Sequence, residues 1–320
     1  MRAIVVREAG SPSVLEPAEV DAPSPGPGQV LVTTAATGVN FIETYQRDGT
    51  YDVPKPFTPG AEASGTIAAV GEGVDDLRVG QRVTTAEAHA TYAEQFVADA
   101  AVLVPVPDGV DDQTAAALPL QGYTAHYLMS STVAVQRGQT VLVHAGAGGV
   151  GLLLTQLLKR AGATVITTVS TDDKEALSRQ AGADHVLRYD GFATAVRDLT
   201  DGAGVPVVFD GVGRSTFDGS LDAAAVRGTV VLFGAASGPV PPVDPQRLNH
   251  GGSLFLTRPT MKDYLRTAEE RRHRADDLFD AVVDGQLDVR VGQTYPLADA
   301  AAAHTDLQAR KTTGKVLLLP

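Results

Sequence analysis

One stretch, residues 140–170, constrains the fold of this chain more than any other. It begins with a short β-branched run, Thr140–Val143, and continues into a glycine-dense turn at residues 144–151. Behind the turn, apolar residues recur at helical spacing as far as Ala161, and Gly162 ends the pattern. A second β-branched run, Thr164–Val169, follows at once. The stretch therefore predicts a strand, a tight turn, a helix and a second strand.

The turn has the spacing of a dinucleotide-binding fingerprint. Gly146, Gly148 and Gly151 stand at the three glycine positions of G-x-G-x-x-G, between a predicted strand and a predicted helix. Glycines there permit the tight turn, the approach of a pyrophosphate to the backbone and close packing of helix against strand. Amide groups at the start of the helix, at Gly149 and Val150, would hold the phosphates. The alternative is a purely structural glycine loop.

The end of the second strand favours NADPH over NADH as the coenzyme. A site for NADH usually has an acidic residue about 20 positions after the fingerprint, which binds the ribose 2′-hydroxyl. Ser170 lies there instead, and Lys174 follows four residues later, so a 2′-phosphate finds room and positive charge. Asp172 and Asp173 are acids close by, which keeps NADH open, although both suit the first turn of a helix.

Composition excludes several classes of protein. The formal net charge of −12 disfavours non-specific binding to nucleic acid or to acidic membranes. The chain has no cysteine, which rules out disulfides, thiolate zinc sites and cysteine nucleophiles. No apolar run has the length of a membrane span and the first residues do not resemble a signal peptide, so we expect a cytoplasmic protein.

The rest of the chain divides by its periodicity. Residues 1–119 contain short strand-like runs separated by glycine, proline and aspartate turns, which predicts a mostly β domain. Helical patterns begin near Asp111, and after Ser170 strands and helices alternate until a long predicted helix at residues 262–284. Six strands in such an alternation predict an α/β fold with a doubly wound parallel sheet, the Rossmann arrangement. Strand-like character returns at residues 316–319 and suggests that the tail rejoins the first domain.

Six motifs follow one another along the chain, at residues 40–45, 59–65, 121–125, 144–151, 210–213 and 310–315. Together they resemble the NADPH:quinone oxidoreductase (zeta-crystallin-like) branch of the zinc-independent medium-chain dehydrogenases and reductases. The resemblance implies a GroES-like β domain at residues 1–119 and 286–320 and a Rossmann domain at 120–285, with the active site in the cleft between them. It also implies a homodimer or a homotetramer, of which we expect the homodimer.

The sequence departs from the zinc-dependent members of that superfamily. Those enzymes have a histidine in the segment where Ala61 stands here, and a cysteine in the first domain. None of the seven histidines has a neighbour at ligand spacing, so we expect no catalytic metal. Without a metal to stabilise an alkoxide, reduction of an electron-poor acceptor fits better than oxidation of an alcohol. The expected reaction is hydride transfer from NADPH to a quinone or to an activated C=C–C=O group.

The resemblance also assigns roles to individual residues. Asn40, Tyr45 and Tyr51 would line the acceptor pocket, and Asn40 could also donate a hydrogen bond to the coenzyme. The two tyrosines could instead be amphipathic surface residues, Lys174 a solvated helix lysine and Tyr189 a loop aromatic. Lys311 and Lys315 could take over the role of Arg310, or face water. The residues expected to bind the coenzyme are Asn40, Thr124, Gly146, Gly148, Gly149, Val150, Gly151, Ser170, Lys174, Tyr189, Gly213, Phe233, Gly234 and Arg310.

Two other functions stay open on the sequence. An NADPH-dependent enoyl or alkenal reductase would share every motif and differ only in the shape of its pocket. An NADPH-binding protein with little turnover, acting as a structural or RNA-binding component, belongs to another class, and the acidic net charge argues against binding to RNA. We therefore expect a small-molecule acceptor as the partner, with neither a nucleic acid nor a membrane.

Overall fold

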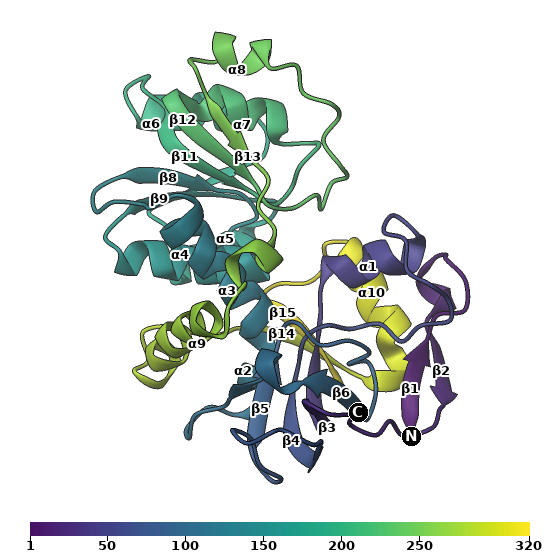
Figure 1. Ribbon diagram of the computed structural model, residues 1–320. Helices are drawn as coiled ribbons and strands as arrows, with labels where there is room; N and C mark the ends of the chain where they lie inside the picture. Colours follow the sequence, from purple (N-terminus) through teal and green to yellow (C-terminus); the bar gives the residue numbers. More distant parts are fainter. The chain divides into compact units, whose positions relative to one another are not determined.

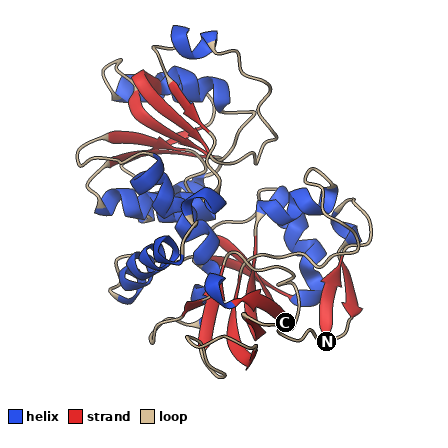
Figure 2. Cartoon of the chain, viewed as in Figure 1, coloured by secondary structure: helices blue, strands red, loops and turns tan.

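The computed structural model describes residues 1–320 and divides into two compact units (Figure 1). The first unit comprises Met1–Gln121 and Thr267–Pro320, and the second comprises Gly122–Arg266. The predicted boundaries agree within two residues at the first crossing and differ by about 20 at the second, where the long helix groups with the first unit. Figure 2 shows helices and strands in both units.

The second unit is built on a six-stranded sheet with the order β10-β9-β8-β11-β12-β13. Each neighbouring pair is parallel, and the order reverses at β8, as in a doubly wound Rossmann sheet. The predicted fold class is confirmed for this unit. The strands are β8 (Thr140–Val143), β9 (Thr164–Val169), β10 (His185–Arg188), β11 (Val205–Asp210), β12 (Ala224–Leu232) and β13 (Phe255–Thr257).

The apolar strand runs form the core of this sheet. Val141, Leu142 and Val143 of β8 are completely buried, as expected for a central strand of a parallel sheet covered on both faces. The helix before β12 ends at Ala223, because the backbone becomes extended at Ala224 and joins that strand. The helices are α4 (Gly149–Arg160), α5 (Asp172–Gln180), α6 (Phe192–Leu199), α7 (Phe217–Ala223) and α8 (Gln246–His250).

Within the first unit, residues 1–119 contain mainly strands, as predicted. Its larger sheet has seven strands in the order β14-β15-β3-β4-β5-β7, with β6 also paired to β3, and β1 and β2 form a separate pair. Tyr92 and Phe96 are among the largest side chains buried in it. The strands are β1 (Arg2–Val5), β2 (Glu16–Glu19), β3 (Gln29–Val39), β4 (Ala63–Val70), β5 (Arg82–Thr85), β6 (Gln95–Asp99), β7 (Val104–Pro105), β14 (Val291–Pro296) and β15 (Lys315–Leu319).

The C-terminal segment completes the first sheet. Strand β15 lies between β14 and β3 and pairs antiparallel with β3, which confirms that the tail rejoins the first domain. Besides α9 (Ala268–Val283), the helices of this part are α1 (Phe41–Asp48), α2 (Asp112–Ala117), α3 (Pro119–Tyr127), which runs across the boundary, and α10 (Ala300–Gln308).

Helix α9 differs from its prediction in two ways. The predicted helix at residues 262–284 is interrupted, because Thr267 caps the start of α9 by accepting a hydrogen bond from the backbone N–H of Glu270. The helix also belongs to the first unit. The buried guanidinium of Arg271 binds the carboxylate of Glu87 at 2.5 Å and the carbonyl oxygen of Ala101 at 3.0 Å. A charge network of this kind leaves no local pattern in the sequence.

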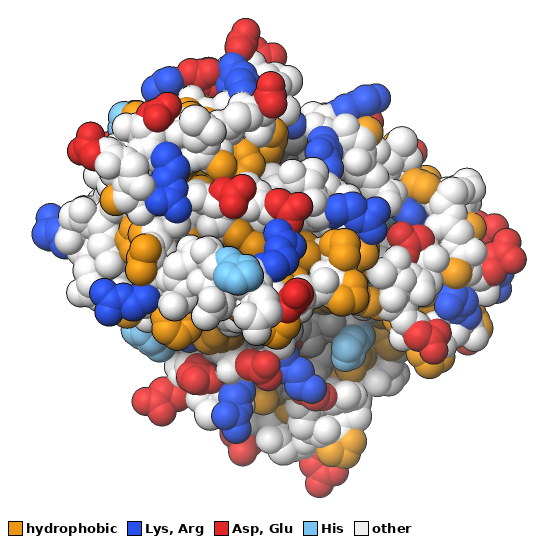
Figure 3. Space-filling model, turned by 90° about the horizontal axis from the view of Figure 1, so that it is seen from above, with side chains coloured by type: hydrophobic (Ala, Val, Ile, Leu, Met, Phe, Trp, Pro, Cys, Tyr) orange, Lys and Arg blue, Asp and Glu red, His pale blue; other side chains and the backbone are white.

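The face of the molecule drawn in Figure 3 shows no concentration of one charge. On the face drawn in Figure 3, acidic and basic side chains are interspersed among neutral and apolar ones. None of the helices combines the length and the apolar character that a membrane crossing requires.

Candidate functional site

The glycine turn after β8 has no space for a side chain at Gly146 or at Gly151. A Cβ atom on Gly146 would lie 2.6 Å from the Cβ atom of Thr167, and one on Gly151 would lie 2.2 Å from the carbonyl oxygen of Ala145. Ala145 itself has a left-handed backbone, with φ of 56°. The spacing of the glycines in the sequence therefore follows from packing at the point where the strand passes into α4.

The N-terminus of α4 is suited to an anion. Gly148 occupies the N-cap position and offers no side-chain acceptor, and the first turn contains no acidic residue. The leading amide groups of Gly149, Val150 and Gly151 are then available to phosphate oxygens. Helix α5 is the opposite case, since Thr171 caps it and carboxylates occupy its first turn. A pyrophosphate fits the start of α4 and not the start of α5.

Three residues predicted to bind the 2′-phosphate lie at one edge of the second unit. The last residue of β10 is paired with Val169 of β9, so Tyr189 and Ser170 both follow directly after neighbouring strand ends. Lys174 stands in the first turn of α5, and its backbone N–H donates to Thr171. The ring of Tyr189 is stacked near that of His144, with centroids 6.3 Å apart. The structure thus places these residues beside the carboxyl ends of two strands, where such sheets bind ligands.

Two further loops, at residues 210–213 and 233–238, pack backbone against backbone. A Cβ atom on Gly234 would lie 2.4 Å from the carbonyl oxygen of Gly211, and Gly213 has φ of 88°. Ser237 ties the loops together, since its N–H and its hydroxyl both donate to the carbonyl oxygen of Val212 at 2.8 and 2.7 Å. Gly213, Phe233 and Gly234, three of the residues expected to bind the coenzyme, therefore belong to one hydrogen-bonded pair of loops.

The buried carboxylate of Asp210 holds the first of these loops. It accepts the backbone N–H groups of Val212 and Gly213 at 2.8 and 2.9 Å. The hydroxyls of Thr216 and Ser220 also donate to it, at 2.9 and 2.8 Å. Ser220 is in turn 3.0 Å from Nε2 of His144, at the start of the glycine turn. One hydrogen-bonded network therefore connects the glycine turn to the loop expected beside the nicotinamide.

Burial keeps the imidazole of this network uncharged. Desolvation lowers the pKa of His144 to about 4, although the nearby charge of Asp210 acts in the opposite direction. At neutral pH a neutral imidazole has one donor and one acceptor nitrogen. These atoms face the hydroxyls of Thr168 and Ser220, so both nitrogens are satisfied.

Replacing Asp210 with asparagine should destabilise the protein by roughly 2–4 kcal/mol, because an amide group presents hydrogens to some of the donors that the carboxylate now accepts. Thermal and urea unfolding would measure the loss. The matched control is Asp218→Asn, because the side chain of Asp218 is 78% exposed in a surface pair with Arg247 and its replacement should change stability by less than about 0.5 kcal/mol. Equal stabilities of the two variants would remove Asp210 from this anchoring role.

In the first unit, Asn40 lies in a buried network of charges. It precedes α1, and its side chain is held at both ends. Oδ1 accepts from the ammonium group of Lys315 at 2.6 Å, and Nδ2 donates to the carboxylate of Glu62 at 2.9 Å. Lys315 and Glu62 also form an ion pair with each other, and both are almost fully buried. Because an ammonium group can only donate, Lys315 fixes the orientation of the Asn40 amide and leaves one hydrogen of Nδ2 unassigned.

Glu62 also connects this network to α3. Its second oxygen accepts the backbone N–H of Leu120 at 2.8 Å, one of the first amide groups of that helix. Lys315 was considered as a substitute for Arg310 or as a residue facing water, and both alternatives are wrong, because its side chain is 1% exposed and bound to Glu62 and Asn40. Asn40, Glu62 and Lys315 thus form a buried polar cluster, which we call the Asn40 cluster.

A second buried carboxyl group, that of Glu43, borders the Asn40 cluster. One oxygen accepts the backbone N–H of Asn40 at 2.8 Å, while the other has no hydrogen-bond partner. Desolvation raises the pKa of Glu43 to about 7, against the opposing attraction of Lys315. Glu43 is therefore partly protonated at neutral pH, because a full negative charge in this buried environment would destabilise the folded protein.

This shift predicts a pH-dependent stability. Between about pH 4.5 and 7 the folded protein keeps a proton on Glu43 that the unfolded chain has lost, so its contribution to the free energy of unfolding falls as the pH rises through this window. The whole change amounts to roughly 3 kcal/mol. Glu43→Gln cannot ionise, so its stability relative to the wild type should rise by about this amount from pH 5 to pH 8.

Thermal unfolding of the wild type and of Glu43→Gln at the two pH values would test this. The buried residues His144 and His304 also have shifted pKa values, but they are common to both proteins and cancel in the comparison. Glu72→Gln, at an exposed position, is the control and should show no pH-dependent difference from the wild type. A constant difference for Glu43→Gln across the range would contradict the prediction.

The predicted acceptor residues Tyr45 and Tyr51 lie together. Their ring centroids are 5.5 Å apart in an edge-to-face arrangement, and the N–H of Tyr51 donates to the carbonyl oxygen of Tyr45 at 2.9 Å. Tyr45 is on α1, the helix that begins directly after its N-cap residue Asn40. Tyr51 follows this helix, and 46% of it is exposed. The structure therefore brings the three predicted acceptor residues to one helix and the turn behind it.

Two other predicted coenzyme residues stand apart from these groups. Thr124 is buried on α3, with 8% exposure. Arg310 is exposed just after α10 and has a left-handed backbone, with φ of 57°. Their roles toward the coenzyme stay predictions.

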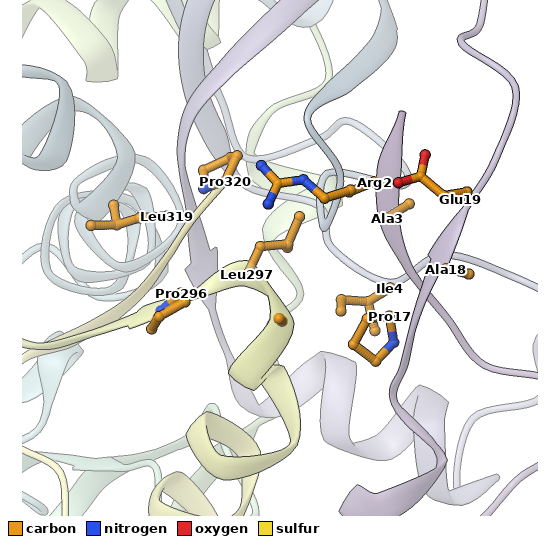
Figure 4. Close-up of a pocket in the computed structure, with 11 residues that line it drawn as sticks. Arg2, Ala3, Ile4, Pro17, Ala18, Glu19, Pro296, Leu297, Leu319 and Pro320 are labelled. Atoms are coloured by element: carbon orange, nitrogen blue, oxygen red, sulfur yellow. The ribbon is translucent and has the colours of Figure 1, made fainter.

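A cavity of about 320 Å³ lies elsewhere in the first unit. Figure 4 shows its lining side chains on β1, on β2 and on the C-terminal segments around Leu297 and Leu319. Most of the lining is apolar, and the guanidinium of Arg2 is paired with Glu94 at 2.6 Å. None of the predicted site residues borders this cavity, so we do not regard it as the active site.

Comparison with known proteins identifies the family. A model of the alcohol dehydrogenase GroES-like domain matches residues 26–108, and a model of the zinc-binding dehydrogenases matches residues 149–281. A quinone oxidoreductase of Pseudomonas aeruginosa is 44% identical over 315 residues, which are 97% of each chain. The chain belongs to the quinone oxidoreductase family. The resemblance read from the motifs is thereby confirmed.

Other members of the medium-chain superfamily are also similar. A 2-haloacrylate reductase of a Burkholderia species is 40% identical over 99% of this chain and 98% of its own. Among solved structures, a mycobacterial protein in complex with NADPH has 54% identity and a TM-score of 0.98, with both chains fully covered. The quinone oxidoreductase of Escherichia coli in complex with NADPH has 37% identity and the same TM-score, also over the full length of both chains.

The name of the second family model implies zinc, and the residues of this chain do not fit a zinc site. The chain has no cysteine, and no group of three or more histidine, aspartate or glutamate side chains is placed to hold a metal ion. In the segment where zinc-dependent relatives have a histidine, this chain has Ala61, followed by Glu62 of the Asn40 cluster.

Sequence reasoning missed several residues of the site. Glu43 and Glu62 lie within motifs of the sequence, but no role was predicted for either. The roles of Asp210 and His144 in the buried network were also not predicted. The one available signal was charge in apolar surroundings. Glu62 stands between alanines at the start of an apolar strand, and Lys315 opens the run Val316–Leu319 of this family member. Charged residues at such positions are rarely buried unless they are paired.

Proposed function

We propose that this chain catalyses the reduction of quinones by NADPH without a metal ion. The observation that carries the proposal is the full-length similarity to quinone oxidoreductases, at 44% identity with the protein of Pseudomonas aeruginosa. The uncapped N-terminus of α4 supports it, because a coenzyme pyrophosphate fits there. When bound, the reduced nicotinamide supplies the hydride.

The residues of the chain have separate tasks in this proposal. The amides of Gly149, Val150 and Gly151, together with Gly146 and Gly148, hold the pyrophosphate, to which Thr124 also contributes. Ser170, Lys174 and Tyr189 receive the 2′-phosphate, and the loops with Gly213, Phe233 and Gly234 lie against the nicotinamide. Arg310 is a further contact to the coenzyme. In each case the support is the position in the fold and the chemistry of the group.

Asn40, Tyr45 and Tyr51 act on the acceptor. The remaining hydrogen of Asn40 Nδ2 and the tyrosine hydroxyls are donors for a carbonyl oxygen on which negative charge develops during reduction. Asn40 is the best prepared of the three, because Lys315 and Glu62 already fix its amide. A tyrosine hydroxyl is a weak acid at neutral pH, so we assign the final proton to water.

Replacing Tyr51 with phenylalanine should lower the rate of quinone reduction roughly 3- to 10-fold and leave the dissociation constant of NADPH unchanged, because only the acceptor loses a donor. Steady-state rates with 1,4-benzoquinone and a coenzyme titration measure the two effects. Tyr264→Phe removes a hydroxyl from a tyrosine stacked on Tyr127 in the second unit and serves as the control. An unchanged rate for Tyr51→Phe would leave it as a lining residue only.

A second candidate is an NADPH-dependent reductase of activated C=C bonds. It is favoured by the 40% identity with a 2-haloacrylate reductase over almost the whole chain. A panel of acceptors separates the candidates: 1,4-benzoquinone and 9,10-phenanthrenequinone on one side, 2-alkenals and 2-haloacrylate on the other. Higher kcat/KM for the quinones supports the first function, and the reverse order supports the second. Turnover of neither class, with tight binding of a U-rich RNA strand, would favour the low-turnover RNA-binding alternative.

We further propose that the protein is a cytoplasmic homodimer. The second sheet ends at β13, which pairs only with β12, and Phe255 on this strand is 61% exposed. An edge strand with an exposed aromatic residue is suited to pairing with the same strand of a second copy. Light scattering of the purified protein gives the mass, and a monomer at micromolar concentration would contradict the dimer.

A further inference from the structure

Arg188 is a charged residue that the proposed function has not used. It is the last residue of β10, paired with Val169 of β9, and so lies beside the segment that begins with Ser170. One nitrogen of its guanidinium, Nη2, is 2.5 Å from Asp172 and 2.9 Å from Glu175. The other terminal nitrogen, Nη1, is buried and has no hydrogen-bond partner. Arg188 thus holds two carboxylates and retains one unsatisfied donor.

The surroundings explain why a cation is needed at this point. The first turn of α5 carries three carboxylates, those of Asp172, Asp173 and Glu175. In many coenzyme sites an acid near this place binds the ribose 2′-hydroxyl, and the same acid would repel a 2′-phosphate. Here two of the three carboxylates are engaged by Arg188, and the attraction of Arg179 and Arg188 keeps the pKa of Glu175 below its usual range. Pairing with arginines therefore offsets the charge of two of the three acids.

We propose that Arg188 determines the preference for NADPH over NADH. It pairs with the carboxylates of Asp172 and Glu175 beside the ribose and so offsets part of their charge, and its Nη1 provides a donor for a phosphate oxygen. A neutral 2′-hydroxyl gains little from this added cation, whereas a phosphate carrying nearly two negative charges gains a charge-assisted hydrogen bond. This inference rests on the proposed use of NADPH. It adds Arg188 to the residues proposed for the 2′-phosphate, namely Ser170, Lys174 and Tyr189. Arg188 acts partly by pairing with neighbouring carboxylates.

The test is a titration of each reduced coenzyme against the purified full-length protein, without an acceptor, followed by the fluorescence of the nicotinamide. Arg188→Gln should raise the dissociation constant of NADPH about 10- to 100-fold and change that of NADH less than about 3-fold. Arg188→Lys keeps the positive charge but loses the planar set of guanidinium donors. Its dissociation constant for NADPH should therefore lie between those of the wild type and of Arg188→Gln. A parallel loss for both coenzymes, or no loss for NADPH, would overturn the proposal.

Arg179→Gln is the matched control. Arg179 binds the other oxygen of Glu175 at 2.8 Å from within the same helix, so its removal disturbs the same carboxylate without touching Arg188. It should leave the ratio of the two dissociation constants unchanged. Thermal unfolding of each variant separates a local effect from loss of the fold. If Arg188→Gln does not fold, the two dissociation constants of Arg188→Lys still test the proposal.

The assay also separates this inference from the proposed function. A wild type that binds NADPH more tightly than NADH but reduces no quinone contradicts the quinone activity and leaves the effect of Arg188 measurable. A wild type that prefers NADH overturns the role of Arg188 directly, whatever acceptor it reduces.

Discussion

Lys315→Met is expected to destabilise the first unit by roughly 3–5 kcal/mol, because it leaves the buried carboxylate of Glu62 without its counter-charge. The melting temperature should then fall by on the order of 10 °C. The substitution also affects two other groups. Asn40 loses the donor that fixes its amide, and Glu43 loses the attraction that opposes the effect of burial on its pKa. Thermal unfolding followed by circular dichroism measures the loss.

Two further variants make this result interpretable. Lys311→Met removes a lysine whose side chain is 69% exposed in a surface pair with Asp306, and it should change stability by less than about 0.5 kcal/mol. The double variant Lys315→Met/Glu62→Gln removes both charges and should recover at least half of the loss. If the double variant were no more stable than the single one, uncompensated charge would not be the cause.

Gly151→Ala is expected to weaken the binding of NADPH at least about 100-fold. The added Cβ atom would lie 2.2 Å from the carbonyl oxygen of Ala145, which is backbone and cannot swing away. The turn must open, and the amide groups at the start of α4 lose their common direction toward the phosphates. Titration of the reduced coenzyme by its fluorescence measures the effect, and thermal unfolding shows whether the second unit stays folded.

Gly26→Ala provides the control for this substitution. The nearest atom to its added Cβ is the Oε1 atom of Gln29 at 3.4 Å, which belongs to a flexible side chain. Its affinity for NADPH should equal that of the wild type. Wild-type affinity in Gly151→Ala would mean that the close contact with Ala145 does not shape the binding turn.

The parts of this structure that sequence predicts well are those encoded by neighbouring residues. The β-branched runs at Thr140–Val143 and Thr164–Val169 and the helix between them were predicted within a few residues, because strand, turn and helix each have a local signature. The six strands of the second sheet follow from the same alternation. The short helix Phe41–Asp48 was not predicted, since it contains few apolar residues at helical spacing and is fixed instead by contacts of Asn40 and Glu43.

The charged networks could not be predicted, because their members are far apart in the chain. Lys315 lies 253 residues after Glu62 and 275 after Asn40, and no pattern within a window of ordinary length relates them. The same holds for Arg271 and Glu87, which attach α9 to the first unit and move a predicted boundary. Only the folded sheet brings such charges together, and the sequence shows them as isolated polar residues near apolar strands.

The position of β15 inside the first sheet has a consequence for synthesis on the ribosome. Strand β3 emerges early, and the whole second unit is then translated before β15 can take its place between β14 and β3. The second unit, contiguous in sequence, can fold while it emerges. The first unit has to wait, with Glu62 unneutralised, until Lys315 arrives. A nascent chain stalled just before β15 should therefore expose its first sheet to protease while its nucleotide-binding half already resists digestion.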